Sequence, residues 1–165
     1  KEIGSMLSEH GFQVLYTRTE DRLLYKEEEN IKGLRKISDL KNRVAYANAY
    51  PGAILISVHM NAYQSASCKG LQVYYSENTE ESEKIAEKIQ SRVVADVQTG
   101  NRRQVKRGKD IYLLEHCEIP AVLIECGFIS NPEECRKLSE KEYRNRLCFS
   151  IVCAMIEYEK TANAV

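Results

Sequence analysis

Two apolar stretches of the chain each lead into a short polar run that holds one residue able to do chemistry. His59 follows residues 53–58, and Glu125 follows residues 121–124. The strand ends of an open α/β sheet form the crevice in which ligands usually bind. A histidine at such a position can bind a metal ion, and a glutamate can act as a general base. We therefore predict that His59 and Glu125 lie in one catalytic site.

Each of these residues also has an ordinary structural explanation. An isolated histidine at a strand end is usually structural, and a glutamate after Ile124 can simply cap the next turn. His116 stands close to two glutamates in an expected loop, where a solvated side chain is the better interpretation. The surrounding sequence must therefore decide between the two explanations.

The pattern of apolar residues predicts alternating helices and strands. We expect helices over residues 1–10, 38–50, 79–99 and 139–159, and strands over residues 14–17, 53–58, 70–76 and 121–124. Residues 19–37 are charged and unperiodic, which indicates a surface loop. The unbroken apolar run 53–58 is typical of a strand covered on both faces. This alternation predicts an α/β fold, a three-layer α/β/α sandwich.

Length and charge narrow the class of protein. The 165 residues suit one domain, and 24 basic residues balance 24 acidic ones. Such a balance gives no electrostatic reason to expect nucleic acid as a partner. No apolar stretch approaches the ~18 residues that a membrane span needs, so we expect none.

The six cysteines are spread along the chain without a CxxC pair. This spacing argues against a zinc knuckle or a thioredoxin-type motif. Disulfides remain an alternative in a secreted protein. Free thiols are favoured, because Cys126, Cys148 and Cys153 fall in apolar contexts where cysteine behaves as a small hydrophobe.

Five motifs in a fixed order carry a resemblance that covers about residues 4–158. They are residues 16–18 with Asp21, residues 39–43 leading to 47–48, residues 57–62, residues 70–75 and residues 125–133. In this combination the chain resembles the zinc-dependent N-acetylmuramoyl-L-alanine amidases of bacterial cell walls. The additional run 32–36 is most similar to the sporulation and germination branch of that family.

The resemblance implies a mixed sheet and one Zn²⁺ held by two histidines and a glutamate, with a second glutamate assisting catalysis. Position by position, His59 matches the second histidine ligand, and Glu125 matches the catalytic glutamate. The first histidine, in a Gly-His-Gly-Gly loop, and the ligand glutamate would both precede Lys1. We therefore expect residues 1–165 to be the C-terminal portion of an N-terminally truncated amidase domain that lacks the first strand and the start of the following helix.

The implied reaction is hydrolysis of the amide between the lactyl group of N-acetylmuramic acid and the L-alanine of the stem peptide. Zinc would acidify a bound water and polarise the carbonyl, and Glu125 would move the proton to the leaving amine. Asn61 and Arg103 are the expected substrate contacts. The basic residues around Arg103 either contact carboxylates of the stem peptide or remain solvated.

Two other classes of protein are alternatives to this one. The first is an inactive fragment or degenerate homologue that at most binds peptidoglycan. The second is a zinc carboxypeptidase of similar architecture, which would need an HxxE-type pair; none of the three histidines is followed by such a glutamate. The resemblance further implies a secreted protein of the bacterial cell envelope and allows an accessory protein as partner.

Overall fold

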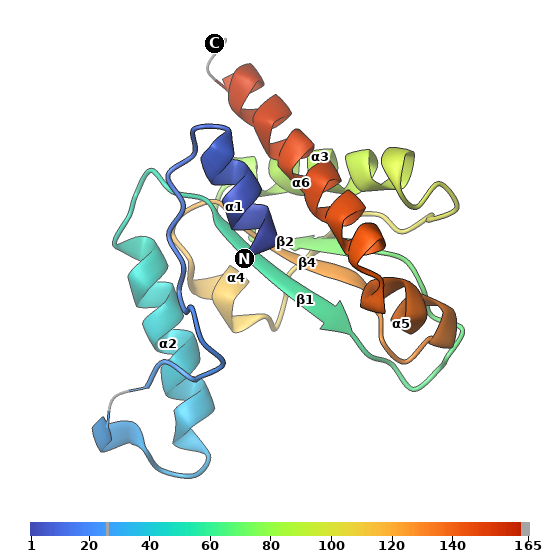
Figure 1. Ribbon diagram of the computed structural model, residues 1–165. Coiled ribbons are helices and arrows are strands. Elements are labelled where there is room, and N and C mark those ends of the chain that lie inside the picture. The colour runs from blue at the N-terminus through green and yellow to red at the C-terminus, as the bar shows by residue number, and fades with distance from the viewer. Residues whose placement is uncertain (26, 163–165) are drawn as a thin grey trace.

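The computed structural model describes residues 1–25 and 27–162. Its elements are α1 (Glu2–Glu9), the short 3₁₀ helix η1 (Glu27–Glu29), α2 (Leu34–Asn48), β1 (Leu55–Asn61), β2 (Gln72–Tyr75), α3 (Glu80–Asp96), β3 (Lys106–Arg107), α4 (Tyr112–His116), β4 (Ala121–Phe128), α5 (Pro132–Ser139) and α6 (Lys141–Ala162). The strands that it describes form one sheet in the order β1-β4-β2-β3. The helices lie on both sides of this sheet (Figure 1).

The sheet is mixed, as the family resemblance implies. Strand β4 pairs in parallel with β1 and antiparallel with β2, and β2 pairs in parallel with β3. Strand β4 is buried along almost its whole length because neighbouring strands and helices cover it on every side. Strand β1 lies at the edge of the sheet, with β4 on one side only.

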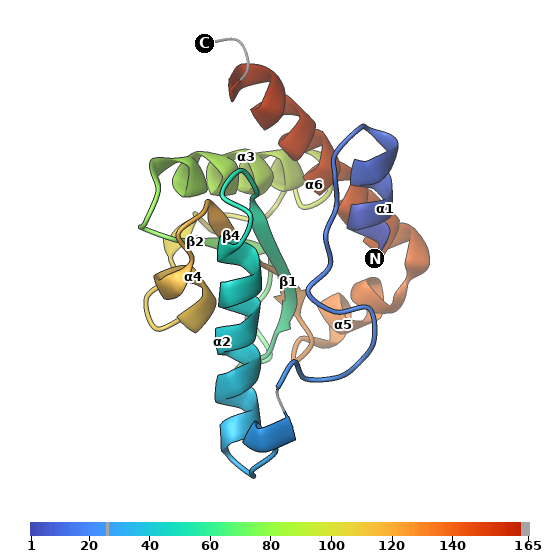
Figure 2. The ribbon, with the colours of Figure 1, turned by 90° about the vertical axis from the view of Figure 1, so that its left-hand side faces the viewer.

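Two hydrophobic clusters hold the three layers together. One cluster joins Val73, Val122 and Ile124 of the sheet to α1, α3, α5 and α6. The other joins Leu123 and Ala121 to α2 and α4 on the opposite face. Figure 2 shows α2 on one side of β1, with α1 and α6 on the other. The predicted α/β/α sandwich is confirmed.

The structure corrects two expectations about strands. Residues 53–58 were expected to form a strand covered on both faces, but β1 runs from Leu55 to Asn61 at the edge, with Val58 and Met60 about half exposed, at 45% and 44%. Residues 14–17 are extended but pair with no strand in the described part of the chain. Of these residues, Val14 packs against the larger hydrophobic cluster, whereas Leu15 and Tyr16 stay exposed, at 43% and 42%.

The structure also moves one helix start and adds the helices η1, α4 and α5. We expected Ser38 or Asp39 to cap the second helix, but α2 begins at Leu34 after Gly33, which adopts φ 95°. Helix α5 was not predicted, although its start carries a clear signal. Asn131 caps it by accepting from the amides of residues 133 and 134, and Pro132 occupies the first turn.

Candidate active site

Three polar side chains stand in a row across three neighbouring strands. His59 on β1 is in register with Glu125 on β4, and Glu125 is in register with Gln72 on β2. Successive side chains of a strand alternate between faces, so Glu125 lies on the same face as Leu123, the face that α2 and α4 cover. The structure therefore brings the predicted pair His59 and Glu125 together and adds Gln72 beside them.

Glu125 lies in a desolvated environment. Its Oε2 atom is buried and has no hydrogen-bond partner among the described residues. Burial raises the pKa of Glu125, because desolvation disfavours the charged form. A carboxylate that holds a proton more readily than usual is suited to take one from water and to return it to a leaving group.

The surroundings of His59 favour its neutral form. Desolvation lowers the pKa of His59, and the positive charges of Arg43 and Arg18 lower it further. The imidazole Nε2 lies 3.0 Å from Ser57 Oγ, which fixes the ring although the residue is exposed at the edge of the sheet. A neutral imidazole is the form that binds a metal ion.

A buried ion pair on α2 organises the wall beside His59. Asp39 accepts two hydrogen bonds of 2.9 Å from Arg43, and it also accepts one of 2.7 Å from the amide of Leu24. Asn42 donates to the carbonyl of Leu24, and Arg43 donates to Thr17 Oγ1 at 3.0 Å. Helix α2 thereby holds the segment 17–24 close to the row. The motif 39–43 was visible in the sequence, but this clamping role was not.

The loops at the ends of β1 and β4 are tied together by α5. Glu134 accepts from the amides of Gly70 and Phe128 at 2.8 Å each. The side-chain amide of Asn131 donates to the carbonyl of Ala66. Asn61, the predicted substrate contact at the end of β1, is in register with Phe128 and its carbonyl accepts from the amide of residue 129.

Arg103 comes to the same end of the sheet from a loop that is distant in sequence. Its Nη1 donates to Gln72 Oε1 at 2.9 Å, and its Nε donates to the carbonyl of Lys69 at 2.8 Å. The guanidinium lies over the Phe128 ring, 4.7 Å from its centroid. Gln72 is a site residue that the sequence did not predict, although it stands in the motif 70–75.

The described residues do not form a zinc site by themselves. No group of three or more His, Cys, Asp or Glu residues comes together in the part of the chain that the structure describes. Zinc in enzymes has three protein ligands and one open position. His10 and His116 lie outside the row and bond the carbonyls of Met6 and Tyr112. Of the described histidines, only His59 is thus placed beside Glu125.

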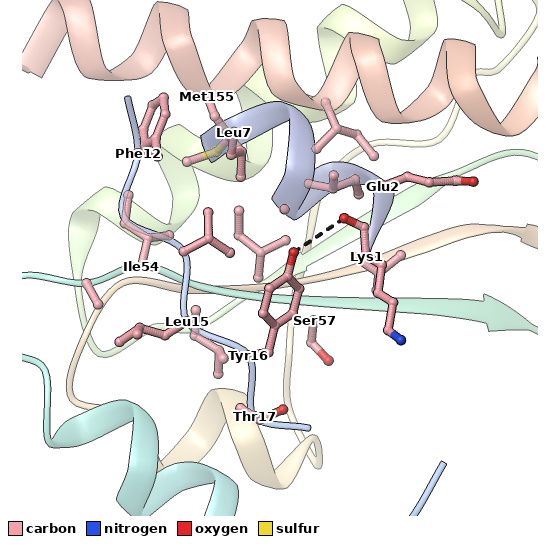
Figure 3. A pocket seen from close by; sticks show the side chains of 18 of the residues that line it. Lys1, Glu2, Leu7, Phe12, Leu15, Tyr16, Thr17, Ile54, Ser57 and Met155 are labelled. Carbon is pink, nitrogen blue, oxygen red and sulfur yellow. Dashed lines mark hydrogen bonds between the residues drawn. The ribbon is translucent and has the colours of Figure 1, made fainter. Parts of the chain in front are cut away.

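A long cavity opens along the free edge of β1. Its volume is about 1090 Å³, and it lies between the extended residues 12–18 and residues 53–58. Figure 3 shows five of its lining residues, with Ile54 close to Phe12 and Leu15, and Ser57 close to Tyr16. Tyr16 Oη donates to the carbonyl of Lys1 at 3.4 Å. Within the described chain no backbone hydrogen bond joins residues 13–17 to β1.

All six cysteines are free, as favoured from the sequence. Burial raises the pKa of Cys117 to about 11 and that of Cys126 to about 12. Both thiols are therefore protonated at neutral pH and are poor nucleophiles. No helix in the described residues is long and apolar enough to span a membrane.

Comparison with known proteins identifies the protein family to which this site belongs. The family model described as N-acetylmuramoyl-L-alanine amidase matches residues 1–157. The chain belongs to this family, which confirms the resemblance drawn from the five motifs.

Individual relatives agree with this assignment. The germination-specific N-acetylmuramoyl-L-alanine amidase of Bacillus subtilis is 34% identical over 156 residues, which cover 94% of this chain and 65% of the relative. The CwlD amidase of Clostridioides difficile, solved in complex with the GerS lipoprotein, is 32% identical with a TM-score of 0.91, covering 97% of this chain and 82% of that one. A second Clostridium difficile 630 amidase structure has 26% identity and a TM-score of 0.81, with coverages of 96% and 78%. The chain thus spans about two thirds of the length of the B. subtilis relative.

Proposed function

We propose that this chain provides the catalytic core of a peptidoglycan amidase that cleaves the bond between the lactyl group of N-acetylmuramic acid and L-alanine. The observation that carries the proposal is the register of His59 and Glu125 on adjacent strands, with the buried Oε2 of Glu125 unpartnered. Membership of the amidase family supports the choice of this bond.

In this proposal each residue of the site has a separate role. Glu125 takes a proton from the attacking water as the carbon–oxygen bond forms and gives it to the L-alanine nitrogen as the carbon–nitrogen bond breaks. His59 is one ligand of a Zn²⁺ ion on which activity depends. Asn61 and Arg103 contact the substrate on the two sides of the row.

We further propose that residues 1–165 form the greater part of one amidase domain, and that the cavity beside β1 accepts a further strand of that domain. The unpaired edge of β1 and the unpaired extended segment 12–17 support this, because each leaves backbone groups that a strand between them would satisfy. That strand would bring the remaining metal ligands to His59. We therefore expect tight zinc binding by the protein at its natural length and weak binding by the 165 residues alone.

The second candidate is a homologue that binds peptidoglycan without cleaving it. The absence of a three-ligand metal group among the described residues favours this alternative. Zinc content distinguishes the two: tight zinc in the natural-length protein supports the enzyme, and none supports the binding protein.

The names of the relatives support proposals about place and partners. Several carry the name "Probable cell wall amidase", and we propose that this protein acts in the cell envelope on peptidoglycan. The C. difficile relative was solved with a lipoprotein, and we propose an accessory protein of this kind as a partner.

The test of the reaction is an analysis of cleavage products. Natural-length protein is incubated with purified peptidoglycan in the presence of zinc, and the released ends are identified by mass spectrometry. We expect new L-alanine amino termini and free lactyl carboxylates. New reducing sugar ends or new D-alanine termini would show a different hydrolase, and no release would favour the binding protein.

A further inference from the structure

Arg103 carries a positive charge that no carboxylate of the described chain neutralises by an ion pair. Two neutral oxygens, those of Lys69 and Gln72, accept its hydrogen bonds, and the Phe128 ring supports its plane. A guanidinium has five N–H donors in a rigid fork, and these two bonds occupy two of them. The guanidinium is therefore fixed in position and still has N–H groups free to bind another acceptor.

The two acidic side chains on the strand and helix beside Phe128 and Gln72 have other positions or partners. Glu134 accepts from two backbone amides, and Glu125 stands beyond Gln72 in the row. The charge of Arg103 is not among the causes of the Glu125 pKa shift, which is due to desolvation. Gln72 therefore separates a fixed cation from the catalytic carboxyl, and it anchors the cation through its own side-chain oxygen.

This arrangement differs from that of a solvated surface arginine. The neighbouring Arg102 is exposed and makes no hydrogen bond or ion pair within the described residues. Arg103 is half-buried, and it is fixed by groups from two separate segments of the chain, residues 69–72 and Phe128. A guanidinium fixed in this way loses little conformational freedom when it binds a planar anion, and a carboxylate matches its fork.

We propose that Arg103, positioned by Gln72 and Phe128, binds a carboxylate of the stem peptide and makes the enzyme prefer peptides whose carboxylates are free over peptides in which they are amidated. The inference rests on the proposed function, because it assumes that the bound stem peptide extends from Glu125 across Gln72 toward Arg103. Arg103 contacts the substrate, whereas Gln72 acts only through Arg103.

The experiment compares two muropeptides that differ only in their stem-peptide carboxylates, free in one and converted to carboxamides in the other. For the natural-length protein we expect the free acid to have the larger kcat/KM, by about tenfold or more, through a lower KM. In Arg103→Gln this ratio should fall to about one, since the fork and its charge are lost. Arg102→Gln removes the same charge from the same loop and should keep the preference.

Binding of the same two peptides to Glu125→Gln, measured by calorimetry, tests the inference without turnover. A tighter complex with the free acid, lost when Arg103→Gln is added, supports it. If the parent protein cleaves both peptides with equal kcat/KM and the Glu125→Gln variant binds both with equal affinity, the inference is overturned, while the amidase proposal stands. Equal loss of preference in Arg102→Gln would also overturn it, because a diffuse basic loop would then explain the effect. If the parent cleaves neither muropeptide, the proposed function fails, and calorimetry alone decides the inference.

Discussion

At the scale of single residues, the site depends on a carboxyl group kept without a partner. A buried acceptor left unsatisfied costs about 1–3 kcal/mol, and a desolvated charge costs more. The other buried polar side chains of this fold, such as Asp39 and Gln90, have hydrogen-bond partners. Glu125 is thus a place where the fold gives up stability, and such places are usually functional.

We expect Glu125→Gln to stabilise the fold in a pH-dependent way. Because the pKa of Glu125 is raised in the folded chain, the parent loses stability as pH rises from the ordinary glutamate range through the raised value. Below that range the carboxyl is neutral in both folded and unfolded chains. The quantity to compare is the melting temperature of Glu125→Gln minus that of the parent. This difference should be larger at about pH 7 than at about pH 4, by about 2–4 °C for each kcal/mol of stability that the parent loses. A difference that does not change with pH would contradict the raised pKa.

At the scale of elements, the sequence predicted a helix or strand correctly where the apolar spacing alone determines it. It failed where a contact with a distant part of the chain decides where the element begins or what covers it. Helices α3 and α6 and strand β4 follow their apolar spacing. The start of α2 was predicted wrongly, because Asp39 forms a buried ion pair with Arg43 and does not cap the helix. The position of β1 at the edge could not be read from its composition, since an apolar run looks the same whether one or both of its edges are paired.

The same reasoning explains how much of the site was foreseeable. His59 and Glu125 follow apolar runs, so their placement on strands could be inferred, although both lie within β1 and β4 and not at the strand ends. Gln72 was not identified, because its role depends on the antiparallel register of β2 and β4, which no local pattern reveals. The roles of Asp39 and Asn42 depend on contacts with Leu24, fifteen or more residues away.

The Asp39–Arg43 pair should stabilise the wall of the site. Burial alone would raise the pKa of Asp39, but hydrogen bonds from Arg43 and from the Leu24 amide outweigh it and lower the pKa. Arg43→Met leaves a buried carboxylate unpaired and should cost about 3–5 kcal/mol in the free energy of unfolding at neutral pH. Denaturant titration measures this loss.

A matched control separates the pair from general damage to α2. In Arg43→Met with Asp39→Asn no charge remains buried, so part of the loss should be recovered. The difference in the free energy of unfolding between the parent and Arg43→Met should shrink as pH falls through the lowered pKa of Asp39, because the carboxyl becomes protonated there. Equal stability of parent and Arg43→Met at neutral pH would rule out the pair as a structural clamp.

At the scale of the whole molecule, the open edge of β1 and the apolar cavity beside it dominate the behaviour expected in solution. An unpaired edge with half-exposed Val58 and Met60 is a template for pairing with another chain. The cavity adds apolar side chains from α1 and α6 to this surface. The 165 residues alone should therefore self-associate.

Sedimentation at several concentrations tests this expectation. We expect the weight-average mass of the 165-residue chain to rise with concentration, and Val58→Lys to reduce the rise, since a charge on an edge strand opposes pairing. Ile31→Lys removes an exposed apolar side chain far from β1 in sequence and should have little effect. A concentration-independent monomer would mean that the edge of β1 needs no partner.

The central claim, that His59 binds the metal and Glu125 moves the proton, is tested most directly by measuring zinc content and amide hydrolysis together in three natural-length proteins. The parent should hold one zinc per chain and cleave muropeptides. His59→Ala should lose zinc and activity together, whereas Glu125→Gln should keep its zinc and its fold and lose about 10²–10⁴-fold in turnover. Full hydrolysis by Glu125→Gln, or unchanged zinc in His59→Ala, would contradict the roles that the row of side chains assigns to them.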